Sequence, residues 1–215
     1  MKKIFVVIFA LMAAGCSQNQ TAPTMPPIAP VASSSSADIN QTPAQAPLPA
    51  GLALPISNAL ARVTKKPFGL YVSPGHSPVS PEKFTGYHTG ADFETTPAEQ
   101  NIDVPIYALC GGKLLLKKYA SGYGGVAVQA CVINGADVTV IYGHLRLSSI
   151  IPQTGQQLTA GQQIAVLGTG YTSETDGERK HLHLGIHKGT SVNILGYVQK
   201  QGDLSQWLNP LSLIK

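Results

Sequence analysis

Glycine and proline divide this chain into short segments. Its 215 residues include 22 glycines and 16 prolines, and only 12% of them are charged, which is typical of a turn-rich β protein rather than a helical bundle. Short apolar runs bounded by turn residues favour strands, and the sequence shows no long helical periodicity. We therefore expect an all-β, mainly antiparallel domain. The expected strands lie at residues 68–72, 104–109, 112–119, 125–133, 137–145, 162–168 and 181–187.

Local signals refine this expectation at three places. Residues 57–66 could form a short helix with Ser57 as its N-cap. The Asn134-Gly135 pair predicts a tight hairpin between the fourth and fifth runs. The repeated Gly-Gln-Gln within residues 154–168 indicates a pair of tight turns rather than a domain repeat.

The N-terminus has the form of an export signal. Two lysines precede an apolar run from Ile4 to Ala14, which is shorter than the roughly 20 residues of a transmembrane helix. The small residues before Cys16 resemble a lipobox, which implies an acylated Cys16 at the mature N-terminus. With Ser17 next to it, this resemblance implies an outer-membrane lipoprotein that faces the periplasm. The alternative is a plain signal peptide cleaved nearby, which would give a periplasmic protein.

Residues 16–50 are rich in Pro, Ala, Ser, Thr and Gln and lack hydrophobic periodicity. Such a segment cannot bury enough apolar surface to offset the entropy of ordering, so we expect a disordered tether. The predicted organisation is a signal peptide over 1–15, a disordered linker over 16–50 and one domain over 51–215.

Net charge gives no support for nucleic-acid binding. The formal charge of +4 falls to +2 without Lys2 and Lys3 of the signal segment, and the remaining basic residues form no stripe.

The three cysteines suggest one disulfide. Acylation of Cys16 would leave Cys110 and Cys131, which an exported protein can keep oxidised. A turn centred near residues 120–121 would place Lys113 opposite Val128 and Cys110 opposite Cys131. Two buried free thiols remain the alternative, because cysteine also behaves as a small hydrophobic residue.

The last expected strand contains the sequence His-Leu-His-Leu. Alternation along a strand places His181 and His183 on one face and turns Leu182 and Leu184 toward the core. Histidines at this spacing are also common on protein surfaces, so this pair alone is a weak signal for a metal.

Other residues strengthen the metal hypothesis. His88 and Asp92 are four residues apart, with Gly90 permitting a sharp turn between them, and His144 ends an apolar run. Histidine and carboxylate are ordinary zinc ligands, and three protein ligands with one open position are typical of catalytic zinc. His76 and His187 receive no role.

Competing chemistries find little support in the sequence. The chain contains neither the His-Glu-x-x-His pattern of helical zinc proteases nor the Gly-x-Ser-x-Gly elbow of serine hydrolases. Cys110 and Cys131 lie in apolar runs, which suits pairing better than nucleophilic catalysis.

The order of these segments resembles one known family. FGLYV, HTGADF, VPIYALCGGKLLL, GYGGVAVQ, VTVIYGHL, GQQIAVLGTG, HLHLGI and NPL are similar to the lysostaphin-type (LytM-domain) zinc endopeptidases of peptidoglycan, over residues 67–211. The resemblance implies a LytM-like zinc peptidase domain, mainly antiparallel, with a narrow groove whose floor holds the metal. It implies Zn²⁺ bound by His88, Asp92 and His183, with His144 and His181 as the catalytic pair.

The implied function is a zinc metalloendopeptidase that hydrolyses amide bonds in peptidoglycan peptide cross-links during cell-wall remodelling. The implied partners are peptidoglycan peptides and, through the lipid anchor, a membrane; the sequence identifies no protein regulator. Two alternatives are a non-catalytic LytM-like module that binds the wall or regulates an amidase, and a D,D-carboxypeptidase. The loop 168–180 could also cover the metal. Tyr71 stands where the family often has arginine, which bears on the peptide that is accepted.

Overall fold

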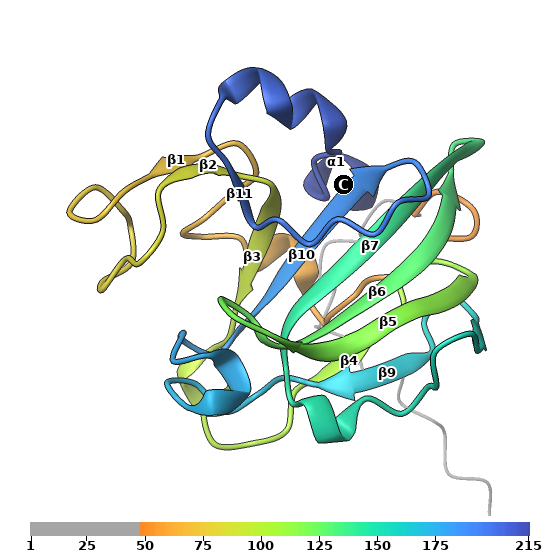
Figure 1. The fold of residues 1–215 in the computed structure, drawn as a ribbon. Helices are drawn as coiled ribbons and strands as arrows, with labels where there is room; N and C mark the ends of the chain where they lie inside the picture. Colours follow the sequence, from red (N-terminus) through yellow and green to blue (C-terminus); the bar gives the residue numbers. More distant parts are fainter. Residues whose placement is uncertain (1–47) are drawn as a thin grey trace, which may run out of the picture. The chain divides into compact units, whose positions relative to one another are not determined.

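A six-stranded sheet forms the centre of the fold (Figure 1). The computed structural model describes residues 48–215, and all neighbouring strands of this sheet are antiparallel. The expected all-β, mainly antiparallel class is therefore confirmed. In spatial order the strands are β3 (Gly90–Glu94), β10 (His181–Lys188), β7 (Ala136–Leu145), β6 (Gly124–Ile133), β5 (Gly112–Ala120) and β8 (Gln157–Leu158).

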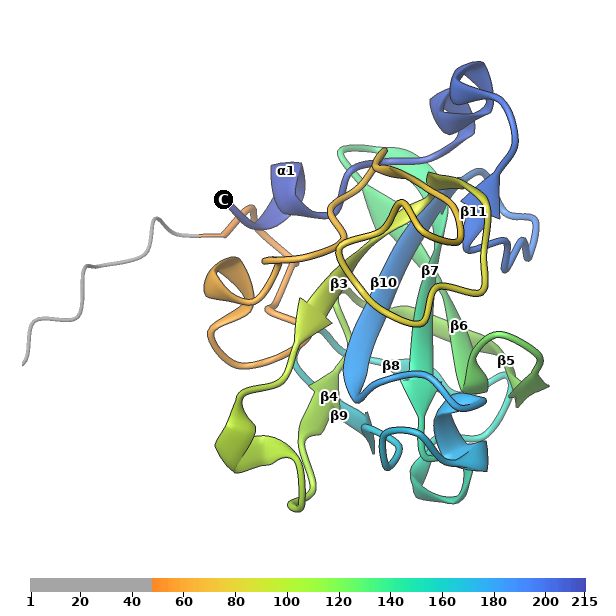
Figure 2. The same ribbon diagram turned by 90° about the vertical axis from the view of Figure 1, so that its left-hand side faces the viewer.

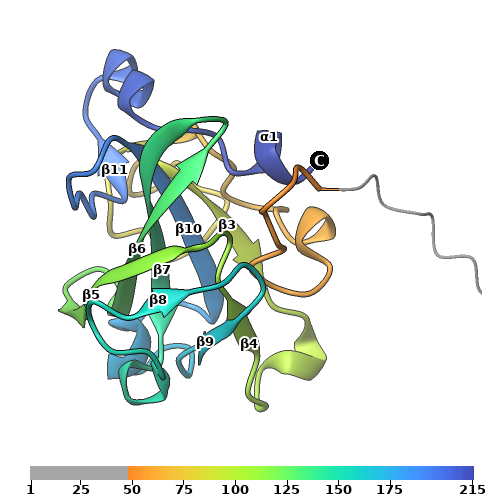
Figure 3. The same ribbon diagram turned by 90° about the vertical axis from the view of Figure 1, so that its right-hand side faces the viewer.

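Two small sheets and several single turns of helix complete the described part of the chain. One sheet joins β1 (Tyr71–Val72), β2 (Gly86–His88) and β11 (Tyr197–Val198), and the other joins β4 (Pro105–Tyr107) and β9 (Gln163–Val166). In Figures 1 to 3, β11 lies toward the upper end of the domain and β4 and β9 toward the lower end. The helical turns are η1 (Ala59–Ala61), η2 (Pro97–Glu99), η3 (Leu147–Ser149), η4 (Ser173–Thr175), η5 (Gln201–Gln206) and α1 (Leu211–Ile214).

The first 47 residues lie outside the described part of the chain. The signal peptide over 1–15, acylation at Cys16 and most of the linker over 16–50 fall there, and they stay predictions. Within residues 48–215, no helix is long and apolar enough to cross a membrane.

Several local expectations are confirmed. Asn134 and Gly135 both have positive φ, 53° and 77°, as the predicted two-residue hairpin between β6 and β7 requires. Gly155 and Gly161 also have positive φ, 89° and 78°, at the two predicted turns. At each of these turns a glutamine carboxamide oxygen accepts a backbone N–H three residues earlier, which explains the repeated Gly-Gln-Gln.

Two local expectations are wrong. Residues 57–66 contain only the one-turn η1, whose N-cap is Asn58 in a left-handed conformation and not Ser57. Gly90 does not form a turn, because it is the first residue of β3, and the break between β2 and β3 falls at Thr89. The short strands β2, β3, β8 and β11 were not among the expected runs, since two to five residues give too little alternation to recognise.

The β5–β6 hairpin has a different register from the expected one. Val128 pairs with Leu116 and not with Lys113, because the turn centres on Gly122 and the ladder shifts between Leu114 and Leu116. The structure nevertheless joins Cys110 and Cys131 by a disulfide, with their Cα atoms 6.0 Å apart. Cys110 lies two residues before β5 begins and forms an isolated bridge with Leu52.

The main core lies on one face of the large sheet. Leu182 and Leu184 of β10 are fully buried in it, together with Ile106 of β4 and Ile164 of β9. The expected inward orientation of the two leucines is thus confirmed. The histidines at alternate positions consequently point to the other face.

Candidate metal centre

The predicted metal ligands come from strands β2, β3 and β10, which belong to two sheets. His183 in β10 lies directly opposite Asp92 in β3 and opposite Gly143 in β7. His88 is the last residue of β2, four residues before Asp92. These three are the one group of clustered metal-ligating side chains found among residues 48–215.

The three ligand atoms have the spacing of a tetrahedral site. His88 Nε2 lies 3.0 Å from His183 Nδ1 and 3.2 Å from Asp92 Oδ1, and the last two atoms are 3.1 Å apart. Zinc bonds of about 2.0–2.1 Å would place tetrahedral donors about 3.3 Å apart. All three side chains are at least 95% buried. Two imidazoles and one carboxylate at this spacing therefore fit zinc.

Gly90 makes this close approach possible. A Cβ atom at Gly90 would lie 2.4 Å from the carbonyl oxygen of Leu184 and 2.8 Å from the imidazole of His183. Only glycine leaves room for β10 and its histidine to pack against the start of β3. Gly90 therefore matters for packing, although not for the turn that the sequence predicted.

His181 and His144 form a second pair beside the three ligands. Their ring centroids are 4.2 Å apart. His181 Nδ1 lies 2.9 Å from the carbonyl oxygen of Arg179, and its Nε2 lies 3.3 Å from Asp92 Oδ2. His144 comes from β7 with a positive φ of 59°, and its Nδ1 is buried without a hydrogen-bond partner. The structure thus brings together all five residues that the sequence selected.

Burial sets the protonation of these groups. It lowers the pKa of His183 to about 4, and it lowers the pKa of His144 far below its usual value. Burial alone would raise the pKa of Asp92, but the surrounding histidines, His181 first, hold it well below its usual value. At neutral pH Asp92 is therefore ionised and His183 unprotonated, which is the state in which these two ligands bind a metal. His144 is unprotonated as well.

Sequence reasoning missed Tyr123, which packs between the two groups of histidines. Its ring centroid is 5.3 Å from His183 and 5.6 Å from His144. The hydroxyl is buried without a partner, and burial raises the pKa of the phenol so that it keeps its proton. Gly143 makes room for this ring, because a Cβ there would lie 2.4 Å from it. The sequence signalled only a glycine-rich turn at this position.

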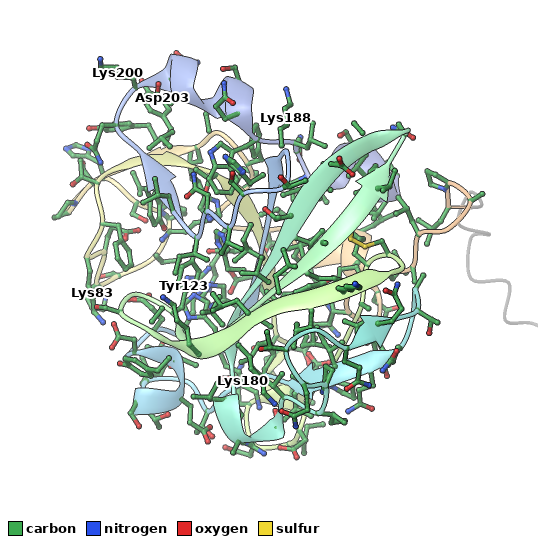
Figure 4. All side chains as sticks on the ribbon, turned by 45° about the vertical axis from the view of Figure 1, so that its right-hand side comes forward. Lys83, Tyr123, Lys180, Lys188, Lys200 and Asp203 are labelled. Carbon is green, nitrogen blue, oxygen red and sulfur yellow. A yellow bond between two sulfur atoms is a disulfide. The ribbon has the colours of Figure 1, made fainter. Side chains whose placement is uncertain are left out.

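The site opens into a cavity of about 370 Å³. Three histidines of the site line it, together with three aromatic residues and two apolar residues from the segment before β11: His144, His181, His183, Tyr123, Phe84, Tyr197, Ile194 and Leu195. The loop 168–180 forms one wall, where Lys83 of the opposite loop lies 3.2 Å from Glu178. Figure 4 shows Lys83 at the edge of the domain and Tyr123 further inside. The loop that could have covered the metal therefore borders the cavity.

Comparison with solved structures finds several that are similar to this chain, all at low similarity. The catalytic domain of lysostaphin from Staphylococcus simulans is 21% identical, with a TM-score of 0.45, covering 69% of this chain and 88% of that domain. Csd3 from Helicobacter pylori is 19% identical, with a TM-score of 0.46, covering 76% of this chain and 34% of Csd3. This chain thus spans about a third of the length of Csd3. No curated protein sequence matches the chain significantly.

The sequence profile of peptidase family M23 matches residues 86–194, which is just over half of the 215 residues. The matched span contains all five residues of the site: His88, Asp92, His144, His181 and His183. The resemblance to the lysostaphin-type (LytM-domain) family is thereby confirmed, and the chain belongs to peptidase family M23.

Proposed function

We propose that this protein is a zinc metalloendopeptidase that hydrolyses amide bonds in the peptide cross-links of peptidoglycan. The observation that carries the proposal is the buried triad of His88, Asp92 and His183 at a cavity, with a second histidine pair next to it. Membership of a peptidase family supports hydrolysis of an amide bond. The choice of peptidoglycan as substrate and of zinc as the metal follows from the resemblance to the lysostaphin-type enzymes.

Zinc held by these three residues would supply Lewis-acid polarisation of the scissile carbonyl and a bound water with a pKa of about 7, far below that of bulk water. Asp92 is ionised and contributes one negative charge to the ligand set, and His183 is neutral. Three protein ligands leave one tetrahedral position for water or substrate.

The geometry of His181 suits a general base. A carbonyl oxygen can only accept, so the Nδ1–H of His181 donates to the carbonyl of Arg179. The lone pair of the neutral ring is then on Nε2, which lies 3.3 Å from the carboxylate of Asp92. A proton taken up at Nε2 would be stabilised by that carboxylate and could be returned to the leaving amine.

Tyr123 and His144 are placed to stabilise charge on the substrate. The Tyr123 hydroxyl keeps its proton and has no partner within the protein, so it can donate to the oxygen of a tetrahedral intermediate. His144 lies beside His181. It can hold the substrate or share a proton with the substrate. Tyr123 thus joins His144 and His181 in the proposed catalytic machinery.

Export completes the proposal, because peptidoglycan lies outside the cytoplasm. An acylated Cys16 would anchor the protein to the outer membrane, and the linker 16–50 would give the domain reach into the wall. Cys16→Ser should abolish palmitate labelling and release the protein from membranes. Unchanged labelling would contradict the lipoprotein assignment.

Incubation of the purified protein with cross-linked muropeptides tests the activity. Loss of muropeptide dimers, abolished by a chelator and restored by zinc, is the result expected of an endopeptidase. Release of D-alanine without loss of dimers would instead identify a D,D-carboxypeptidase. Unchanged muropeptides with and without zinc would favour a binding or amidase-regulating module.

A further inference from the structure

The two oxygens of the Asp92 carboxylate face different partners. Oδ1 lies within 3.2 Å of the ligand nitrogens of His88 and His183, on the side of the proposed metal. Oδ2 accepts a hydrogen bond of 2.8 Å from Nη2 of Arg179 and lies 3.3 Å from His181 Nε2. One oxygen of the carboxylate thus faces the proposed metal, and the other contacts side chains of the protein.

Arg179 is fixed by a second carboxylate. Its Nη2 donates to Glu94 Oε1 at 2.6 Å, and its Nε lies 3.0 and 3.1 Å from the two oxygens of Glu94. Glu94 follows Asp92 by two residues on β3, so both side chains point to the same face and meet one guanidinium. Arg179 is only 8% exposed, and its planar fork has little freedom to leave this position.

We infer that Arg179 is a positioning residue that restricts Asp92 to binding the metal through Oδ1 alone. A carboxylate beside a divalent cation can bind through both oxygens, but Oδ2 here is turned away and held by a charge-assisted hydrogen bond. One-oxygen binding keeps the fourth position free for water. The inference rests on the proposed metal site and adds the residue that shapes it.

Neither neighbouring cation could take over this role. A lysine ammonium is a point charge and cannot bridge two carboxylates in a fixed plane. Lys65 lies 3.6 Å from Glu94, and its side chain is half exposed. Lys180, which follows Arg179, donates instead to the backbone carbonyls of Glu99, Gln100 and Ile102.

Metal binding by the full-length protein tests the inference without relying on activity. Zinc affinity is measured by competition with a chelator, and Co²⁺ absorption reports the coordination number, since four-coordinate Co²⁺ absorbs visible light more strongly than five-coordinate Co²⁺. We expect Arg179→Ala to weaken zinc binding about 10–100-fold and to weaken the Co²⁺ band. Arg179→Lys should restore little of either.

Two further variants keep the test decisive. Arg146→Ala is the matched control, because Arg146 also bridges two carboxylates, Asp103 at 2.8 Å and Glu174 at 3.3 Å, away from the site. It should leave zinc affinity and the Co²⁺ spectrum unchanged. If Arg179→Ala does not fold, Glu94→Gln tests the same contact, because it loosens the fork and should weaken zinc binding in the same direction.

The outcomes separate this inference from the proposed function. Wild-type zinc affinity and an unchanged Co²⁺ spectrum in folded Arg179→Ala, or in Glu94→Gln where the first variant fails to fold, would overturn the role of Arg179 and leave the metal site intact. Failure of the wild-type protein to bind zinc would overturn both.

Discussion

The two ends of β10 carry the same sequence pattern in different surroundings. His181, His183 and His187 are separated by even numbers of residues, so they share one face of the strand. At the first end, β10 lies between β3 and β7, and Asp92 stands opposite His183. At the other end β3 has stopped, His187 is opposite Thr139 of β7, and its ring packs edge-on against Trp207 with centroids 4.8 Å apart.

His183 is buried and His187 is half-buried, but the protonation of the two rings does not distinguish the two ends. Burial lowers the pKa of both His183 and His187, so both rings are neutral near pH 7. The difference is the neighbouring strand, because only β3 supplies a carboxylate at the first end. Alternation along the strand therefore determines the face of a side chain, while its chemistry depends on the residues that the adjacent strand places beside it.

Substitution of a single histidine at each end of β10 should give the largest difference, which is a difference in zinc content. His183→Ala should abolish zinc retained after dialysis, since it removes one of three ligands, whereas His187→Ala should keep the wild-type metal content. Metal analysis of both purified variants provides the measurement. Zinc lost from His187→Ala but retained by His183→Ala would contradict the assignment of the metal site to the first end of β10.

His181→Ala tests the division of roles within the first end of β10. Zinc content should remain, because His181 faces Asp92 Oδ2 and not the ligand atoms. Turnover should fall about 10²–10⁴-fold, the usual contribution of a general base. Both quantities are measured on the same preparation. Loss of zinc from His181→Ala, with zinc retained by His183→Ala, would reverse the assignment.

Tyr123→Phe tests whether the hydroxyl beside the first end of β10 acts on the substrate. The ring that packs against His183 remains, while the unpartnered hydroxyl is removed. We expect kcat to fall up to about 10²-fold, with KM and zinc affinity nearly unchanged, because an oxyanion donor acts mainly in the transition state. An unchanged kcat on cross-linked muropeptides would exclude Tyr123 from catalysis.

Glu99→Gln gives the smallest effect and concerns the loop 94–103 beside His181. Hydrogen bonds from Arg62 lower the pKa of Glu99 to about 2. A lowered carboxyl pKa stabilises the fold above the unfolded value, near 4.5, and this stability is lost as pH falls toward 2. The free energy of unfolding of the wild type should therefore decrease over this window, by on the order of 2 kcal/mol from this group.

Urea unfolding at several pH values measures this dependence. Glu99→Gln should be less stable than the wild type at pH 7. Its free energy of unfolding should also lack the part of the decrease toward pH 2 that comes from Glu99. An identical pH dependence of the unfolding free energy in the two proteins would show that the contact between Arg62 and Glu99 does not depend on the Glu99 charge. Lys188→Ala, at the far end of β10, is the control and should follow the wild-type curve.

Much of the fold could be predicted because its signals are local. The Asn134-Gly135 hairpin and the turns at Gly155 and Gly161 follow from residues that tolerate positive φ. The long strands β5, β6, β7 and β10 contain enough alternation to be recognised. The single turn η1 and the strand β3 could not be predicted, because propensity over three to five residues is overridden by tertiary packing.

The face on which His181 and His183 lie follows from the sequence alone, because side chains alternate along any strand. The motifs of the sequence also indicated the family. Three contacts could be seen only in the tertiary structure. Asp92 contacts His183 across 91 residues of sequence, and Tyr123 packs between the histidines. Arg179 donates a hydrogen bond to the second oxygen of Asp92. These contacts depend on strand register and on loops that pack against one another. Neither leaves a periodic trace in the residues involved.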